Sequence, residues 1–121
     1  MIDPNFILLY VESPTNSVAF YTKLLGKEPI DASPTFAMYD LDSGVKLGLW
    51  ARHTVTPKVV SAPGSFELAF CVADRSVVND THAEWAEKGL TIAQVPGQMD
   101  FGYTFTALDP DGHRLRVFAP E

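Results

Sequence analysis

Apolar and polar positions change period several times along the chain, and the same succession occurs twice. In the first half, apolar runs of strand length and one segment of helical spacing predict a strand, a helix and three more strands at residues 6–11, 14–25, 29–30, 36–39 and 46–50. Ser13 is a suitable N-cap for the helix, Pro14 suits its first turn, and Gly26 supplies its end. The first half is therefore predicted to have the order βαβββ.

The second half repeats this order. Its pattern predicts a strand, a helix and three more strands at residues 66–72, 74–88, 90–95, 103–108 and 114–118. Pro96-Gly97 predicts a turn. Asp109-Pro110-Asp111-Gly112 predicts a tight connection between the last two strands, because proline presets its own φ and glycine tolerates a positive one. The repeated order indicates two fused modules.

Residues 53–64 separate the two halves. They contain two prolines and one glycine and show little periodicity, which is typical of a linker or of a loop over the mouth of a pocket. Residues 1–121 are thus predicted to form a single α+β domain of two repeated modules, at about 5–52 and 65–119. The alternative that the pattern leaves open is an unrepeated α+β sandwich.

Composition excludes several kinds of partner. The chain has 121 residues and a net charge of −6, and its nine Lys and Arg residues are scattered, so nucleic acid and membrane are not expected partners. No apolar run is long enough to span a bilayer, and the N-terminal residues lack the basic region of a signal peptide. A single cysteine, Cys71, allows no intramolecular disulfide, and a cytoplasmic location is expected.

Side chains capable of catalysis are few and separated. His53, His82 and His113 fall in the linker, the second helix and a turn, and none has a partner at metal-ligand spacing. Cys71 lies within an apolar strand, where a thiol is usually an inert core residue. We therefore predict no catalytic residue.

A resemblance to a known family follows from three motifs in this order of elements. They are Phe20-Tyr21 with Leu24-Leu25-Gly26 in the first helix, and Asp109-Pro110-Asp111-Gly112-His113 before the last strand. Together they resemble the vicinal-oxygen-chelate superfamily, which includes glyoxalase I, extradiol dioxygenases and bleomycin-type resistance proteins. The run Phe101-Gly102-Tyr103-Thr104-Phe105, with Trp50 ending the fourth strand, is most similar to the phenazine-antibiotic resistance proteins. The resemblance implies curled half-barrel sheets around a cavity, and a homodimer with shared cavities.

The resemblance also implies where a metal ion would bind. Metalloenzymes of the superfamily place their ligands at positions that correspond here to Phe6, Gly48, Glu67 and Arg116. Phe6 and Gly48 have no ligating side-chain atom, and Arg116 is a permanent cation. We therefore expect no metal and no cofactor, and we expect Glu67 and Arg116 to form an ion pair.

The resulting hypothesis is a non-enzymatic protein that binds or sequesters a small planar aromatic compound, such as a phenazine- or bleomycin-like antibiotic. The residues expected to bind this ligand are Trp50, Phe101, Tyr103, Phe105, Glu67, Arg116, Phe36 and Met38. The rival hypotheses are a diverged metal-dependent enzyme of the glyoxalase or dioxygenase type, and a protein-interaction module with a filled cavity.

Strand alternation extends the expected pocket. If the four metal-ligand positions face the cavity, then the same faces carry Leu8, Tyr10, Trp50, Ala69, Cys71 and Phe118. The faces of residues 36–38 and 101–105 stay open at this stage. For Phe36, Phe70 and Phe105, the alternative that they fill the interior of the modules is equally good.

Overall fold

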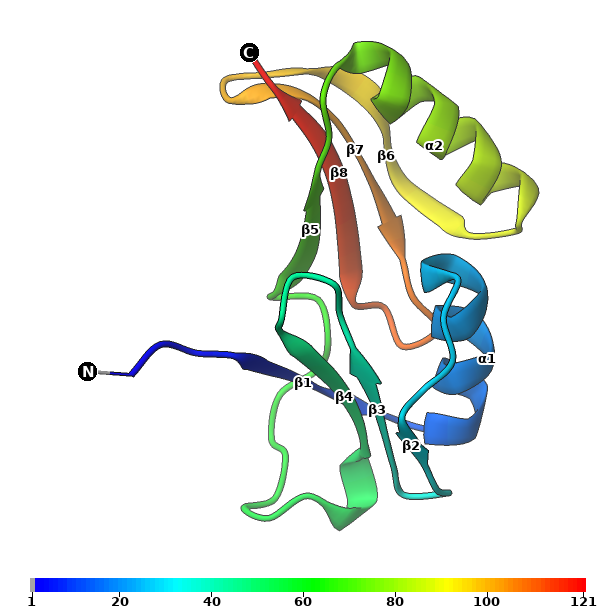
Figure 1. Ribbon diagram of the computed structural model, residues 1–121, viewed down its shortest axis with the longest axis vertical. Coiled ribbons are helices and arrows are strands. Elements are labelled where there is room, and N and C mark those ends of the chain that lie inside the picture. Colours follow the sequence, from blue (N-terminus) through cyan, green and yellow to red (C-terminus); the bar gives the residue numbers. More distant parts are fainter. Residues whose placement is uncertain (1) are drawn as a thin grey trace. The chain divides into compact units, whose positions relative to one another are not determined.

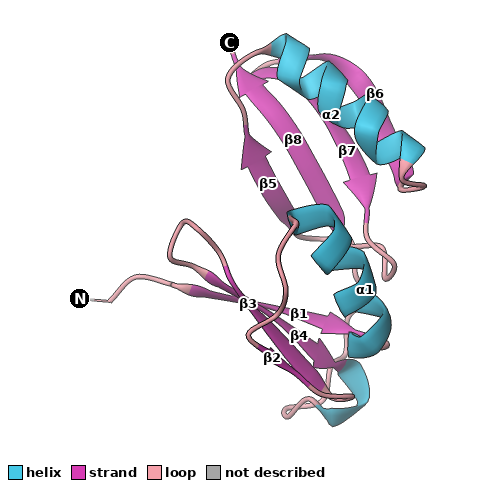
Figure 2. Ribbon diagram, turned by 45° about the vertical axis from the view of Figure 1, so that its right-hand side comes forward, coloured by secondary structure: helices cyan, strands magenta, loops and turns pink. Residues whose placement is uncertain are grey.

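The computed structural model describes residues 2–121, and the chain divides into two compact units, one ending at Ser61 and one spanning Ala62–Glu121. Each unit contains one helix and one four-stranded sheet (Figure 1). In each unit the helix covers one face of its sheet and leaves the other face without a helix (Figure 2). The α+β fold of two βαβββ modules is confirmed.

The first unit contains β1 (Phe6–Val11), α1 (Pro14–Leu25), β2 (Asp31–Ala32), β3 (Phe36–Asp40), β4 (Lys46–Ala51) and the short 3₁₀ helix η1 (Arg52–Thr54). The strand order in its sheet is β1-β4-β3-β2. Strands β1 and β4 are parallel, whereas β4, β3 and β2 are antiparallel neighbours. Helix α1 connects β1 to β2 at the far edge of the sheet, and the antiparallel strands β2, β3 and β4 then lead back to β1, so that β4 pairs with β1 in the parallel direction.

Local chemistry sets the two ends of α1. The Ser13 side chain accepts a hydrogen bond from the backbone N–H of Asn16, and Pro14 occupies the first turn, where no partner for its nitrogen is needed. Gly26 ends the helix with a φ of 68°, and its N–H donates to the carbonyl of Thr22. Tyr21 of this helix is fully buried against the sheet core. The predicted helix is therefore confirmed at both ends.

The core of the first unit lies between α1 and the sheet. Alternate residues of the three long strands point to this side, and seven of them are at most 3% exposed: Leu9, Val11, Ala37, Tyr39, Leu47, Leu49 and Ala51. The Tyr39 hydroxyl donates to the carbonyl of Val18 and lies 2.8 Å from the Thr22 hydroxyl, so its polar end is satisfied within the core. Burial raises the pKa of Tyr39, so the phenol stays neutral.

The second unit contains β5 (Glu67–Cys71), α2 (Arg75–Glu87), β6 (Thr91–Met99), β7 (Gly102–Leu108) and β8 (Arg114–Pro120). Its strand order, β5-β8-β7-β6, repeats that of the first sheet, with β5 parallel to β8. The core between α2 and this sheet holds Phe105 and Trp85, whose ring centroids are 5.5 Å apart in an edge-to-face arrangement. Leu115 and Val117 of β8 are at most 1% exposed on the same side.

Three local details differ from the sequence expectations, and one is confirmed. The second strand lies at Asp31–Ala32, whereas the sequence predicted it at residues 29–30. Strand β6 continues through Pro96-Gly97 with irregular register, where the sequence predicted a turn. The segment predicted as a linker begins with the 3₁₀ turn η1. The tight connection before β8 is confirmed: Asp109 Oδ1 accepts hydrogen bonds from the backbone N–H groups of Asp111 and His113, both at 2.9 Å. Neither described helix is long and apolar enough to cross a membrane.

Candidate functional site

The helix-free face of the first sheet is largely apolar and rich in aromatic side chains, with the Lys46–Asp40 ion pair at one end. It carries Phe6, Leu8 and Tyr10 from β1, Phe36 and Met38 from β3, and Gly48 and Trp50 from β4. The register pairs Phe36 with Trp50 and Met38 with Gly48, and residues that pair across strands lie on the same face. The structure therefore settles the orientation that the sequence left open, because Phe36 and Met38 share the face of Trp50.

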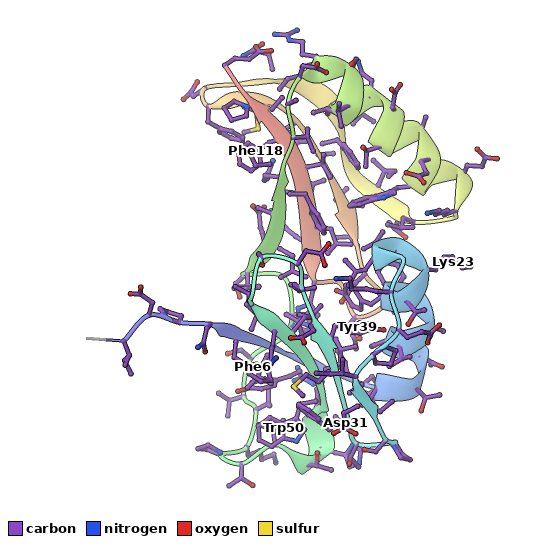
Figure 3. The ribbon with its side chains drawn as sticks, viewed as in Figure 1. Phe6, Lys23, Asp31, Tyr39, Trp50 and Phe118 are labelled. Carbon is purple, nitrogen blue, oxygen red and sulfur yellow. The ribbon has the colours of Figure 1, made fainter. Side chains whose placement is uncertain are left out.

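An open groove of about 450 Å³ lies on this face and is lined by Phe6, Leu8, Phe36 and Trp50. Phe6, at the start of β1, is 40% exposed, and Leu8, within the strand, is 43% exposed, so two large apolar side chains are left open to solvent here. Tyr10 pairs with Trp50 and meets its ring edge to face, at 6.2 Å between centroids. Figure 3 labels Phe6 and Trp50 on the open side of the sheet and Tyr39 on the side of α1. Exposed apolar surface of this kind is typical of a binding site.

The first two metal-ligand positions, Phe6 and Gly48, lie in contact on this face. A Cβ atom at Gly48 would be 2.9 Å from Phe6 Cε1, so the ring rests directly on the glycine. Phe6 offers only an apolar ring, and Gly48 has no side chain, so neither side chain can bind an ion here. The Phe6 ring thus packs against the backbone of β4 at a position that has no side chain.

The other two positions, Glu67 and Arg116, form the ion pair that the sequence predicted, and that prediction is confirmed. Arg116 Nε donates to Glu67 Oε1 at 2.8 Å, and Arg116 Nη2 donates to Glu67 Oε2 at 2.9 Å, which makes the ion pair bidentate. The Arg116 side chain is 16% exposed, and the Glu67 side chain is 31% exposed. These hydrogen bonds from Arg116 lower the pKa of Glu67, against the opposing effect of its partial burial. The carboxylate is therefore ionised at neutral pH.

Three neighbouring polar side chains complete the arrangement, and sequence reasoning missed all of them. Arg116 Nη1 donates to Gln94 Oε1 at 3.1 Å and to Thr104 Oγ1 at 3.2 Å. The Thr106 hydroxyl donates to the same Gln94 oxygen at 3.1 Å. The signal that could have found the two threonines is their alternation with the buried Phe105. Gln94 had no such signal, because it lies beside an irregularity in β6.

Phe101 lies on the same face as Arg116, in the turn before β7. The Arg116 guanidinium carbon is 5.7 Å from the Phe101 ring centroid, and Phe101 meets Phe118 edge to face at 5.9 Å. Phe101 is 43% exposed. Of the predicted aromatic ligand contacts in the second half, Phe101 thus lies beside the Glu67–Arg116 pair.

Tyr103 and Phe105 lie on the opposite face of β7, and this corrects the expectation that they line one pocket with Phe101. Phe105 is fully buried, with its ring against Trp85 and His82 of α2. Tyr103 donates its hydroxyl to Asn79 of α2 at 2.9 Å, and the Arg75 guanidinium covers its ring.

The physical reason lies at Gly102, which separates Phe101 from Tyr103. Its φ is 148°, and a Cβ atom there would lie 2.1 Å from the carbonyl oxygen of Ala119. The backbone therefore leaves the turn in a conformation that only glycine adopts with ease. Strand alternation does not carry through this residue, so the spacing of two between Phe101 and Tyr103 does not place them on one face.

Cysteine and histidine positions are also settled. Cys71 is exposed and pairs with Phe118 on the helix-free side, so its expected place in a core was wrong and its expected face was right. His82 packs on Phe105, and the backbone of His113 closes the turn before β8. Among residues 2–121, His, Cys, Asp and Glu form no group of three or more suited to a metal ion.

Three comparisons with known proteins agree on the family. A model of the Glyoxalase/Bleomycin resistance protein/Dioxygenase superfamily matches residues 4–117. The phenazine antibiotic resistance protein EhpR of Enterobacter agglomerans is 27% identical over 119 residues, which cover 96% of this chain and 91% of that protein.

Solved structures show the same fold. A protein of Agrobacterium tumefaciens, solved by NMR in solution, is 50% identical with a TM-score of 0.92, and the match covers 100% of this chain and 99% of that one. A glyoxalase-related enzyme from Fulvimarina pelagi is 22% identical with a TM-score of 0.85, covering 98% of this chain and 88% of that one, and it shows the common fold. The chain belongs to the glyoxalase, bleomycin resistance protein and dioxygenase superfamily.

Proposed function

We propose that the protein binds and sequesters a small planar aromatic compound, without transforming it, as a resistance protein does. The observation that carries the proposal is the open groove of about 450 Å³ between Phe6, Leu8, Phe36 and Trp50. Small-molecule sites are concave, mostly apolar and lined by aromatic side chains with a few polar groups nearby. A flat aromatic ring matches such a surface in shape, and offset or edge-to-face contacts with Trp50 and Phe36 would hold it.

The relative EhpR supports the class of ligand. Its name ties it to resistance against phenazine antibiotics, and it is similar to this chain along nearly the whole length of both. A phenazine consists of three fused aromatic rings, which is the kind of compound that the groove would accept. The superfamily also includes enzymes, so the non-enzymatic part of the proposal depends on the positions of Phe6 and Gly48, where no ligating side chain is present.

Roles follow from the two helix-free faces. Trp50 would serve as the stacking platform, with Phe36 and Met38 beside it on the same face. In the second unit, Glu67 and Arg116, with Phe101 next to them, offer hydrogen-bonding groups to a polar ligand group. Glu67 is ionised, so its carboxylate would accept hydrogen bonds from ligand N–H or O–H groups.

Assembly is part of the proposal. We propose a homodimer, because each unit leaves one sheet face without a helix and exposes large apolar side chains there, including Phe6, Leu8 and Tyr10. Apolar faces of this kind are stabilised by association, and twofold pairing is the most common closed form. Light scattering at micromolar concentration tests this directly, and a monomeric mass would contradict it.

A fluorescence titration with phenazine tests the proposed ligand class. Binding is expected to quench Trp50, whereas Trp85, which is 5% exposed and packed against Phe105, should respond little. Trp50→Ala should weaken binding by about 1–3 kcal/mol through lost apolar burial and stacking. Trp85→Phe is the matched control, because it keeps an aromatic ring in the core and leaves Trp50 as the single tryptophan.

The outcomes separate the alternatives. Equal affinities of wild type and Trp50→Ala would exclude Trp50 as the platform. Failure of the wild type to bind phenazine and related fused-ring compounds would overturn the ligand class. A stoichiometric divalent ion in the purified protein, with an activity that chelation abolishes, would instead establish the metal-dependent enzyme.

A further inference from the structure

Gly48 lies beneath the groove, and the groove's lining side chains rest on it. A Cβ atom at this position would be 2.6 Å from Leu8 Cδ2, 2.9 Å from Phe6 Cε1 and 3.2 Å from Phe36 Cζ. Three of the four lining residues therefore occupy the space that any side chain at position 48 would need. The residue is buried although it lies on the helix-free face.

The backbone at this position does not itself require glycine. Gly48 is in the middle of β4, between its ladder partners Leu8 and Met38, and its φ is not in the positive region. Glycine in the middle of a strand weakens the strand, because it loses more conformational freedom on folding and has no side chain to pack. The glycine is therefore explained by the neighbouring side chains, which occupy the space that a side chain at position 48 would need.

We propose that Gly48 is a specificity-determining residue that sets the depth of the groove, and this inference rests on the proposed function. Without a Cβ atom, the ends of Phe6, Leu8 and Phe36 settle onto the strand and leave room above them for a ring. The bottom of the groove is entirely hydrocarbon, and a polar group buried there would lose its hydrogen bonds to water without replacement. The ligand class that follows is a fused aromatic ring system whose inserted edge has no hydrogen-bonding substituent.

The clash at position 48 involves the ends of side chains, which can move. An alanine there would push Leu8 and Phe6 away from the strand, toward the open side, and the fold would persist. The displaced side chains would then fill part of the groove. Gly48→Ala is thus expected to change the groove more than the stability of the protein.

A double-mutant cycle tests the inference with two probes, phenazine with three rings and quinoxaline with two. Gly48→Ala should weaken phenazine binding about tenfold, in line with the cost of overpacking, and quinoxaline binding less. Leu8→Ala in the Gly48→Ala background should restore part of the phenazine affinity, because it removes the side chain nearest to the new methyl group. Unchanged phenazine affinity in Gly48→Ala, or losses that simply add in the double variant, would overturn the inference.

Crystal structures of wild type and Gly48→Ala test the groove independently of any ligand. The variant should show Leu8 and Phe6 displaced outward and a smaller groove, whereas an unchanged groove would refute the role of Gly48. If the wild type binds neither probe while the groove shrinks as expected, the proposed ligand fails and the role of Gly48 in shaping the groove stands.

A matched control separates the effect of the groove from that of the substitution. Gly97 of β6 also has a φ outside the positive region, and a Cβ atom there would have only the Val95 carbonyl oxygen within 4 Å, at 3.9 Å. Gly97→Ala should therefore keep or raise the melting temperature, whereas Gly48→Ala should lower it. A melting temperature for Gly48→Ala as high as that of Gly97→Ala would show that the space above Gly48 is not restricted.

Discussion

The helix-free faces of the two modules share one strand arrangement but carry different side chains at equivalent positions. In the first module Phe6 lies two residues before the ladder partner of Gly48, and in the second Glu67 lies two residues before the ladder partner of Arg116. The same diagonal relation between neighbouring strands therefore places the Phe6 ring against Gly48 in one sheet and the Glu67 carboxylate against the Arg116 guanidinium in the other. This pair of positions is therefore part of a hydrocarbon groove in the first module and of a polar cluster in the second.

The helix-covered faces differ much less. Leu47 and Leu49 flank Gly48 on β4, and Leu115 and Val117 flank Arg116 on β8, and all four are at most 1% exposed. Both sheets thus keep an aliphatic layer beneath the helix, where close packing restricts change. On β4 and β8, therefore, the difference between the repeats lies on the side where no helix packs.

The largest expected effect separates the two faces of the second module. Phe105→Ala should lower the free energy of unfolding by about 3–5 kcal/mol, because it removes a fully buried ring from contact with Trp85. Phe101→Ala should cost less than about 1 kcal/mol, because Phe101 is 43% exposed. Urea denaturation measures both values, and similar losses in the two variants would contradict the assignment of these residues to opposite faces.

The next effect concerns the polar cluster. Arg116→Ala should lower the free energy of unfolding by about 1–3 kcal/mol, because it leaves the partly buried Glu67 carboxylate without its bidentate guanidinium partner. The double variant Glu67→Gln with Arg116→Met should recover part of this loss, since no unpaired charge is left. Additive losses in the cycle would show that the two side chains do not stabilise each other.

Sequence periodicity predicted the helices and the longer strands, because most of these strands have one face that is less exposed and each helix has one buried side. It misplaced the short β2, whose two residues are both exposed. The Glu67–Arg116 pair was predicted from the resemblance to the superfamily, whose metal ligands occupy the corresponding positions, and the structure confirms that the two side chains meet. Phe101 and Tyr103 were not separable in this way, because the conformation of Gly102 depends on the close approach of Ala119 from another strand.

Two further features of the site were out of reach of the sequence. Gln94 reaches Arg116 from a strand whose register shifts on both sides of it, so counting residues along β6 gives no face. The role proposed for Gly48 depends on side chains from two other strands meeting above it. Contacts that depend on three strands at once leave no periodic signal in any one of them.

The pH dependence of stability tests the contribution of the Glu67–Arg116 pair on the second face. Because Arg116 lowers the pKa of Glu67 in the folded protein, the pair stabilises the fold above the ordinary glutamate pKa of about 4.3, and this is lost as the pH falls through the folded value. The stability difference between wild type and Glu67→Gln should therefore shrink below about pH 4.

Thermal unfolding from pH 7 to pH 3 measures this difference. The variant Glu67→Gln with Arg116→Met is the control, because it lacks the titrating carboxylate and its partner. A difference between wild type and Glu67→Gln that stays constant over this range would contradict the role of the ionised carboxylate.

The smallest expected effect compares the starts of the two helices, which are capped by different chemistry. The Ser13 hydroxyl accepts from the N–H of Asn16, whereas Asp74 Oδ1 accepts from the Ser76 hydroxyl and from the N–H of Val77. Both groups of hydrogen bonds satisfy helix N-terminal donors, but only the carboxylate titrates. The Ser76 hydroxyl and the Val77 N–H lower the pKa of Asp74 in the folded protein, so its contribution is present above the ordinary aspartate pKa and is lost below the folded one.

Ser13→Ala should therefore cost about 0.5–1 kcal/mol of stability at any pH between 3 and 7, since a hydroxyl keeps its form throughout that range. Asp74→Ala should lower the melting temperature at pH 7, and its difference from wild type should narrow as the pH falls below about 4, where the aspartate begins to protonate. Asp74→Asn is the matched control, because it retains an acceptor oxygen for Val77 and carries no charge at any pH. If the deficit of Asp74→Ala persisted unchanged at the lowest pH at which the protein folds, the cap of the second helix would be acting through geometry alone, like that of the first.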